Sequence, residues 1–281
     1  MANYLMRYPN GKAKALTLSY DDGVYSDIRF IETIDRYGLK ATFNLNGGCF
    51  LSEDEVTDSP TRRLTKKEAI ALYTNCGHEI ACHGYTHKHA TDLPRDAVAY
   101  EFLKDREVLE NMFGRVIRGM AYAYGNHSDE VIDTVRATGI VYGRTTVSTH
   151  NFSLPKERLA LPATCHHRDA ALMELAEQFV TLAIRPFDTV RLFYVWGHTY
   201  EFVHADNWDV IERFGEYIGN RDDIWYATNI EIYEYIEAYK SLVYSADMTR
   251  VYNPTATKLW ITSDAGRLYT VAPGETVALN G

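Results

Sequence analysis

Short apolar runs alternate along the chain with longer segments in which apolar residues recur at every third or fourth position. The short runs are typical of buried strands, and the longer segments are typical of helices that pack on one face. Strand-like runs occupy residues 15–19, 41–45, 78–82, 118–122, 140–144, 159–163, 192–196 and 224–228. Helix-like segments lie between most of them, at 26–38, 65–76, 94–113, 129–138, 170–184, 208–218 and 230–239.

This alternation determines the expected architecture. Strands that alternate with helices pair in parallel, and their crossovers are right-handed. Seven or eight such units in about 240 residues predict an α/β fold, a distorted (β/α) barrel. A doubly wound open sheet is the alternative, although no Gly-x-Gly-x-x-Gly fingerprint follows a strand-like run.

Two of the expected helices carry local start signals. Ser26 precedes the first apolar-periodic segment, which Gly38 closes, so Ser26 is expected to cap that helix. Thr65 and Glu68 have the spacing of a capping box at the start of the next helix.

The pattern changes after about residue 241. Residues 251–254, 258–261 and 268–271 are short strand-like runs separated by Gly and Pro turns, which favours antiparallel pairing. The sequence therefore predicts a catalytic domain over 1–240 and a small C-terminal β extension over 241–281, too short to fold alone.

Composition indicates a globular protein and disfavours two classes of partner. Hydrophobic residues make up 46% of the 281 residues and charged residues 24%, as in globular enzymes. The formal net charge is −9, without a basic cluster, which disfavours nucleic acid and anionic membranes. An oligomer is compatible with this composition.

The first residues and the cysteines bear on the compartment. Residues 1–14 lack the long apolar core of a signal peptide, and no stretch approaches the roughly 20 apolar residues of a membrane span. Four cysteines show no Cys-x-x-Cys spacing. We therefore expect a cytoplasmic protein with reduced thiols.

Candidate chemistry gathers where strand-like runs end, which is where β/α barrels place their catalytic groups. Asp21 and Asp22 directly follow the first run and precede Gly23. Two adjacent carboxylates need not point the same way, so one can bind a metal while the other acts as a base. An ordinary Asp-Asp-Gly turn is the alternative interpretation.

His83 and His87 follow the third run, four residues apart. Such a pair is weak evidence alone, because histidine pairs are common on surfaces. Together with a carboxylate from the first strand, however, two histidines around an open position form the ligand set of a hydrolytic zinc centre.

Two further strand ends carry polar or aromatic residues. The run that ends in Tyr124 and Gly125 could offer the Tyr124 N–H to an oxyanion, or it could be a buried strand end and turn. His198 follows the run 192–196, with one glycine between them. A lone histidine is usually structural, but at a strand end it could serve as a general acid.

In this order, the motifs resemble the polysaccharide deacetylase family (NodB homology, similar to carbohydrate esterase family 4). The family's first motif, usually Thr-Phe-Asp-Asp-Gly, resembles residues 19–23. Its second, His-(Ser/Thr)-x-x-His, resembles 83–87, with Gly84 at the hydroxyl position and the usual lead-in at 77–80. Its fifth, Leu-x-His, resembles 196–198.

The resemblance implies a role for each motif residue. It implies that Asp21 is the general base and that Asp22, His83 and His87 bind a divalent metal, with His198 as the general acid. The metal that it implies is Zn²⁺, with Co²⁺, Ni²⁺ or Mn²⁺ as alternatives, and the implied substrate is an acetylated carbohydrate.

The sequence departs from the family at two other motifs. Ala121 stands where the third motif has the arginine that supports the catalytic aspartate, and the Asp-Trp motif is not recognisable. Arg144, at the end of the next strand, could supply the missing guanidinium or contact substrate. Trp196 replaces the family's leucine and is expected to reshape the pocket for the acetyl methyl group.

Three more polar residues are candidates for substrate binding. His166 and His167 follow an apparent strand, and either line the substrate cleft, supply a second metal site or belong to a solvent-facing loop, which the pattern favours. Glu201 lies three residues after His198 and could orient its imidazole.

These observations predict a metal-dependent hydrolase that removes acetyl groups from N-acetylated sugars or oligosaccharides. An O-acetyl esterase of the xylan type would use the same residues, and related enzymes act on amides that are not sugars. The remaining alternative is a carbohydrate-binding protein with a decayed site, which Ala121 favours and the five motif residues disfavour.

Overall fold

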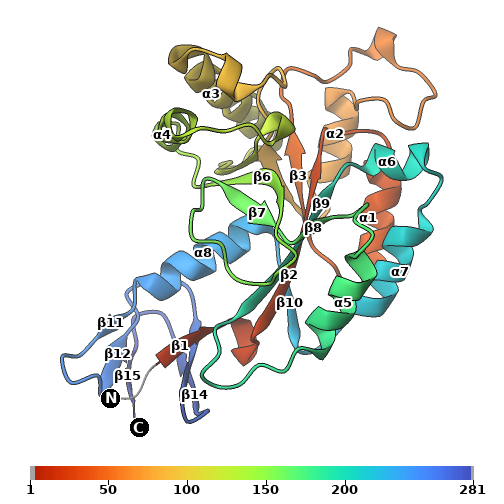
Figure 1. Ribbon diagram of the computed structural model, residues 1–281. Helices are drawn as coiled ribbons and strands as arrows, with labels where there is room; N and C mark the ends of the chain where they lie inside the picture. Colours follow the sequence, from red (N-terminus) through yellow and green to blue (C-terminus); the bar gives the residue numbers. More distant parts are fainter. Residues whose placement is uncertain (1–3, 280–281) are drawn as a thin grey trace.

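The computed structural model describes residues 4–279 and has a parallel sheet at its centre (Figure 1). The sheet order is β7-β6-β5-β4-β3-β2-β9-β8, and β10 also pairs with β2. The strands are β2 (Lys14–Asp21), β3 (Ala41–Leu45), β4 (Glu79–Cys82), β5 (Gly119–Ala121), β6 (Tyr142–Ser148), β7 (Leu161–Ala163), β8 (Cys165–His166), β9 (Arg191–Gly197) and β10 (Ile224–Tyr226).

The two end strands of this order, β7 and β8, are separated in sequence by Thr164 alone. The Thr164 N–H donates to the Tyr194 carbonyl on β9 over 2.8 Å, and the His150 N–H donates to the Thr164 carbonyl over 2.9 Å. One extended segment therefore bonds to both edges and curls the sheet back on itself. The predicted α/β fold with a distorted (β/α) barrel is confirmed, and the open doubly wound sheet is not formed.

Helices surround the sheet (Figure 1). They are α1 (Asp27–Arg36), α2 (Lys66–Tyr73), α3 (Arg95–Phe113), α4 (Asp129–Ala137), α5 (Leu172–Thr181), α6 (Thr199–His204), α7 (Asp209–Ile218) and α8 (Asn229–Lys240), with 3₁₀ turns η1 (Pro9–Gly11), η2 (Glu53–Glu55), η3 (Ala90–Asp92) and η4 (Ala123–Gly125). The short α6 was not predicted, because six residues show no clear period. None of the helices within residues 4–279 has the length and apolar character that crossing a membrane requires.

The two predicted helix starts have different outcomes. The Thr65–Glu68 capping box is present at α2. Ser26, in contrast, makes no side-chain cap to α1, and its hydroxyl instead hydrogen-bonds to the Thr199 hydroxyl over 2.8 Å. The prediction of Ser26 as a cap was wrong because a tertiary partner competes for the hydroxyl group.

The C-terminal residues form two small antiparallel sheets at one end of the molecule, beside α8 (Figure 1). Their strands are β1 (Tyr4–Arg7), β11 (Val243–Tyr244), β12 (Arg250–Tyr252), β13 (Leu259–Ser263), β14 (Leu268–Val271) and β15 (Thr276–Ala278). The antiparallel extension is as expected, but β1 comes from the N-terminus and pairs with β13. The division into 1–240 and 241–281 stays a prediction, and one strand of the extension comes from the first segment.

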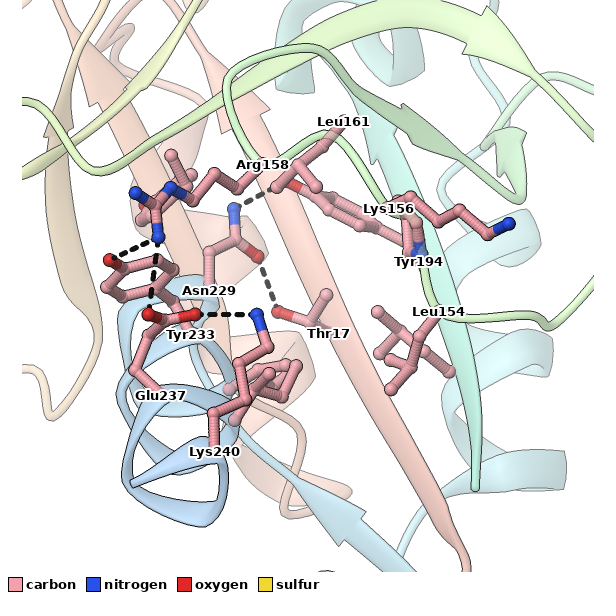
Figure 2. Close-up of a pocket in the computed structure, with 15 residues that line it drawn as sticks. Thr17, Leu154, Lys156, Arg158, Leu161, Tyr194, Asn229, Tyr233, Glu237 and Lys240 are labelled. Atoms are coloured by element: carbon pink, nitrogen blue, oxygen red, sulfur yellow. Dashed lines mark hydrogen bonds and ion pairs between the residues drawn. The ribbon is translucent and has the colours of Figure 1, made fainter. Parts of the chain in front are cut away.

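The start of α8 closes one end of the barrel with polar groups. The Asn229 side chain accepts from the Thr17 hydroxyl (2.8 Å) and donates to the Tyr194 hydroxyl (2.6 Å), as Figure 2 shows. All three residues are buried. Because buried polar groups are costly unless paired, this network fixes the position of α8 against β2 and β9.

Glu79 is a second buried polar group at this end of the barrel. Its carboxyl group accepts from the Tyr142 hydroxyl (2.6 Å), the Thr42 hydroxyl (2.8 Å) and the Ile230 N–H (2.8 Å). Burial outweighs these hydrogen bonds and raises the pKa of Glu79 from 4.5 to about 7. The folded protein therefore holds this proton to a higher pH than the unfolded chain does.

We expect Glu79→Gln to flatten the dependence of stability on pH. A raised pKa in the folded state contributes stability that is complete below about pH 4.5 and is lost as the pH rises through about 7, up to about 3 kcal/mol. Urea unfolding at pH 5 and pH 8 measures this, with the exposed Glu216→Gln as control. An unchanged difference between the two pH values in Glu79→Gln would contradict the prediction.

Candidate active site

The carboxyl ends of four strands meet at one rim of the barrel. Asp21 ends β2, His83 follows β4, Ala121 ends β5, and His198 follows β9. The strands are parallel, so their carboxyl ends share one edge, and groups 177 positions apart in sequence come together there.

Asp22, His83 and His87 form a group that fits a divalent cation. The Asp22 Oδ1 atom lies 3.5 Å from His87 Nε2 and 4.0 Å from His83 Nε2. One ligand atom from each residue lies within 4.8 Å of the others. A cation bonded at about 2 Å to each of three ligands holds them roughly 3–4 Å apart, so small shifts suffice.

The second ring nitrogen of each histidine contacts a neighbouring strand end. His83 Nδ1–H donates to the Ala121 carbonyl over 2.9 Å, which leaves the Nε2 lone pair facing Asp22. His87 Nδ1 lies 3.2 Å from the Tyr124 hydroxyl. Burial lowers the pKa of both histidines, that of His87 to about 4, so both are neutral, which is the ligand form.

Backbone conformation at the rim is unusual. Asp22, His87 and Tyr124 have φ angles of 86°, 56° and 59°, in the left-handed region that residues other than glycine rarely adopt. Such strain persists where surrounding structure enforces it, and it clusters at functional sites. These three residues are among those that the sequence predicted for the site.

The helix α3 holds the histidine loop in place. Asp105 accepts from the His83 N–H (3.0 Å) and the Gly47 N–H (2.6 Å), while Glu101 accepts from the Thr86 N–H (2.8 Å) and hydroxyl (2.7 Å). Sequence analysis missed both carboxylates, because on an amphipathic helix they resemble ordinary solvent-facing charges.

Asp21 is almost fully buried and is paired with Arg144. Both Asp21 carboxylate oxygens lie 2.5 Å from Arg144 Nη2, and Asn44 Nδ2 donates to Oδ1 over 2.8 Å. Burial alone would raise the pKa of Asp21, but the positive charge of Arg144 and the neighbouring His83 and His198 lower it to about 2. Asp21 is therefore ionised at neutral pH.

Arg144 reaches Asp21 from the strand beside Ala121. These two residues are register partners in the β5–β6 pair. The Arg144 side chain is fully buried, and its guanidinium stacks over the Trp196 ring at 4.6 Å. Arg144 and Trp196 thus contact each other beneath the rim, and Arg144 faces Asp21 rather than solvent.

His198 stands opposite the two aspartates. Its Nε2 atom lies 3.8 Å from Asp21 Oδ2 and 4.0 Å from Asp22 Oδ2, while Nδ1 lies 3.2 Å from Glu201 Oε2. Burial alone would lower the pKa of His198, but the hydrogen bond to Glu201 and the charges of the aspartates raise it. The protonated form is therefore favoured by its surroundings.

Tyr124 and Arg63 flank the group formed by Asp22, His83 and His87. The Tyr124 ring is half exposed and stacks on His89 at 3.9 Å. Arg63, between β3 and α2, donates to Asp22 Oδ1 over 2.8 Å and to Asn46 Oδ1 over 2.7 Å. A carboxylate has enough lone pairs to accept a hydrogen bond from arginine and to bind a cation at the same time. No sequence pattern singled out Arg63.

The segment that contains His166 and His167 contradicts one expectation. A solvent-facing loop was favoured there, yet His166 lies on β8 and only 1% of His167 is exposed. The prediction was wrong because a strand of two residues is too short to show a period. Glu201 Oε2 lies 3.1 Å from His166 Nε2 and 3.6 Å from His167 Nε2.

A separate cavity lies away from this rim, between α8 and the segment before β7 (Figure 2). Arg158 reaches Glu237 on α8, and Lys240 pairs with Glu237 along the same helix. Thr17, in its wall, precedes Asp21 by four residues on β2, about 13 Å along a strand. None of the fifteen residues lining this cavity belongs to the group around Asp21.

Comparison with known families finds a match in the first half of the chain. Residues 8–143 match the family model described as polysaccharide deacetylase. This segment, slightly less than half of the chain, is similar to the polysaccharide deacetylase family. The matched segment contains Asp21, Asp22, His83, His87 and Tyr124, whereas Arg144 and His198 lie beyond it.

Solved structures of similar proteins share the fold. A candidate polysaccharide deacetylase from Mycobacterium smegmatis has a TM-score of 0.61 at 18% identity, over 85% of this chain and 96% of that one. A family 4 carbohydrate esterase from Streptomyces lividans, in complex with acetate, has a TM-score of 0.51 at 14% identity, over 76% and 92%.

The Xyl-CE4 domain of a multidomain xylanase, from the hindgut metagenome of Trinervitermes trinervoides, has a TM-score of 0.51 at 15% identity, over 80% of this chain and 92% of that one. No curated protein sequence matches this chain. At these identities the likeness to polysaccharide deacetylases of known structure shows the fold.

Proposed function

We propose that this protein is a metal-dependent hydrolase that removes acetyl groups from N-acetylated sugars or oligosaccharides. One observation carries the proposal: a group of three side chains that fits a cation, an ionised buried carboxylate and a histidine face one another at the rim where β/α barrels act. The similarity of residues 8–143 to polysaccharide deacetylases supports the acetylated carbohydrate as substrate.

Asp22, His83 and His87 would hold the cation. Two imidazoles and one carboxylate favour Zn²⁺, and Co²⁺, Ni²⁺ or Mn²⁺ suit the same ligands. When bound, such a cation polarises an acyl carbonyl and lowers the pKa of water.

Asp21 is the proposed general base. Its carboxylate is ionised at neutral pH and lies 3.7 Å from His83 Nε2, beside the position of the cation, so it can take a proton from the attacking water. Arg144 holds this carboxylate in place and ionised, in the manner expected of the arginine that Ala121 replaces.

His198 is the proposed general acid. Glu201 accepts from Nδ1–H and thereby turns Nε2 toward the reacting group, where its proton passes to the departing nitrogen. The Tyr124 N–H is proposed to stabilise the oxyanion. The Trp196 ring packs on Arg144, and we propose that its edge limits the space for the acetyl methyl group.

Acetate release from N-acetylated and O-acetylated oligosaccharides tests the proposal. We expect release from the N-acetylated substrates, a loss of at least about tenfold with chelator, and recovery with Zn²⁺. Preferential release from O-acetylated xylan fragments would make the enzyme an O-acetyl esterase with the same residues.

No release from either class, with the cation shown to be bound, would instead support a substrate that is not a sugar or a carbohydrate-binding protein with a decayed site.

A further inference from the structure

A second group of ligand-type side chains lies on the far side of His198 from the first. His166 on β8, the adjacent His167 and Glu201 on α6 each offer one atom, and these atoms all lie within 4.8 Å of one another. The Glu201 Oε2 atom is 3.1 Å from His166 Nε2 and 3.6 Å from His167 Nε2. These separations match those of the Asp22 group.

His167 is the unusual member of this group. It is 1% exposed, yet neither of its ring nitrogens has a hydrogen-bond partner within residues 4–279. Buried polar groups in native proteins are normally paired, so an orphan imidazole requires a physical account. Its Nε2 atom lies 3.6 Å from Glu201 Oε2, which is too long for a hydrogen bond.

The surroundings hold the His167 ring in this position. It stacks on Phe202 at 4.1 Å and lies parallel to the Tyr20 ring at 5.6 Å. A Cβ atom on Gly197 would come within 1.9 Å of His167 Nδ1, so only glycine permits this approach. The ring cannot turn to find another partner without disturbing these contacts.

Hydrogen bonding within the group does not satisfy these nitrogens. Three imidazoles converge on Glu201 Oε2, because His198 Nδ1 lies 3.2 Å away in addition to His166 and His167. Two lone pairs on one oxygen cannot serve three donors. The other oxygen, Oε1, lies 3.3 Å from Arg168.

We propose that His166, His167 and Glu201 bind a second divalent cation of the Zn²⁺ class. A cation between the three would take the lone pair that His167 leaves unused and would bring both imidazoles onto one centre. The side chains of His166 and Glu201 are 19% and 14% exposed, so the group is partly open to solvent.

This second site uses none of the three residues of the first cation group, but it shares Glu201 with the proposed general acid His198. Occupancy would draw Oε2 toward the cation and weaken its hydrogen bond to His198 Nδ1. The ion would also join β8 to α6, and so bind the folded state and not the unfolded chain.

Metal stoichiometry tests the proposal without any measurement of activity. Equilibrium dialysis against Zn²⁺, followed by elemental analysis, is expected to give two ions per chain in the wild type. His87→Gln and His166→Gln should each give one, and the double variant none. The exposed His150→Gln, whose imidazole pairs with Asp169 on a nearby segment, is the matched control and should keep two.

His167→Phe provides a second variant, because it keeps an aromatic ring against Phe202 while removing both nitrogens. It should bind one ion, with circular dichroism reporting the fold. In His87→Gln, Zn²⁺ should still raise Tm, and adding His166→Gln should abolish that rise.

One ion in both wild type and His166→Gln would overturn the second site while leaving the first intact. Two ions per chain in each of the folded single variants, His166→Gln and His167→Phe, would also overturn the second site.

Discussion

Asp21→Asn is expected to lower kcat about 10²–10⁴-fold while the Asp22 group keeps its cation. The substitution removes the carboxylate that would take the proton from water, and it leaves the three ligand atoms unchanged. Asparagine also retains an oxygen that can accept from Arg144. The measurements are kcat on the best acetylated substrate and bound metal by elemental analysis.

The same experiment separates the roles of the two aspartates. If Asp21→Asn lost the cation from the first site, Asp21 would be a ligand and Asp22 the base. The exposed Asp206→Asn makes the same chemical change at a residue outside the groups around Asp21 and Asp22, and it should retain both activity and metal. Thermal unfolding of each variant is needed, because Asp21→Asn leaves the buried Arg144 without its counter-ion.

Arg144→Met is expected to reduce the free energy of unfolding by about 3–5 kcal/mol, because it leaves the buried Asp21 charge unpaired. Asp21→Asn together with Arg144→Met should recover part of that loss, since neither charge then remains in the protein interior. Urea unfolding of the single and double variants measures the coupling. The exposed Arg118→Met, which breaks a surface pair with Glu234, should change stability little.

Arg144→Met should also change the dependence of activity on pH. Arg144 holds the pKa of Asp21 down at about 2, so its removal raises that pKa, and the carboxylate is ionised only at higher pH. The acidic limb of the kcat/KM profile is therefore expected to move to higher pH. An acidic limb at the wild-type position would show that Arg144 does not control the ionisation of the proposed base, Asp21.

The lowered pKa of Asp21 in the wild type also affects stability in acid. A pKa of Asp21 below its usual 3.8 contributes stability above about pH 4, and this contribution is lost as the pH falls through about 2. Arg144→Met lacks that contribution. The difference in the free energy of unfolding between this variant and the wild type should therefore shrink in strong acid.

Several features of this protein follow from local patterns in the sequence. The alternation of apolar runs with helical periods specifies parallel pairing, and parallel strands bring their carboxyl ends to one rim. Asp21, Asp22, His83 and His198 could therefore be expected near one another before any distance was known. The Thr65 capping box could be predicted because both of its partners lie within one helical turn.

Other features depended on the tertiary structure. Arg144 pairs with Asp21 because the β5–β6 register places it beside Ala121, and parallel strands buried on both faces lack the alternation that would specify their register. Arg63 and Asp105 reach the site from a loop and a helix face, where charges normally face solvent.

The burial of His167 depends on barrel closure through Thr164, and β1 becomes a strand only through β13. Local sequence determines which element a residue joins and which face it occupies. Long-range packing decides which charged side chains pair with one another. Only in the closed barrel does such pairing offset the cost of burying the charges.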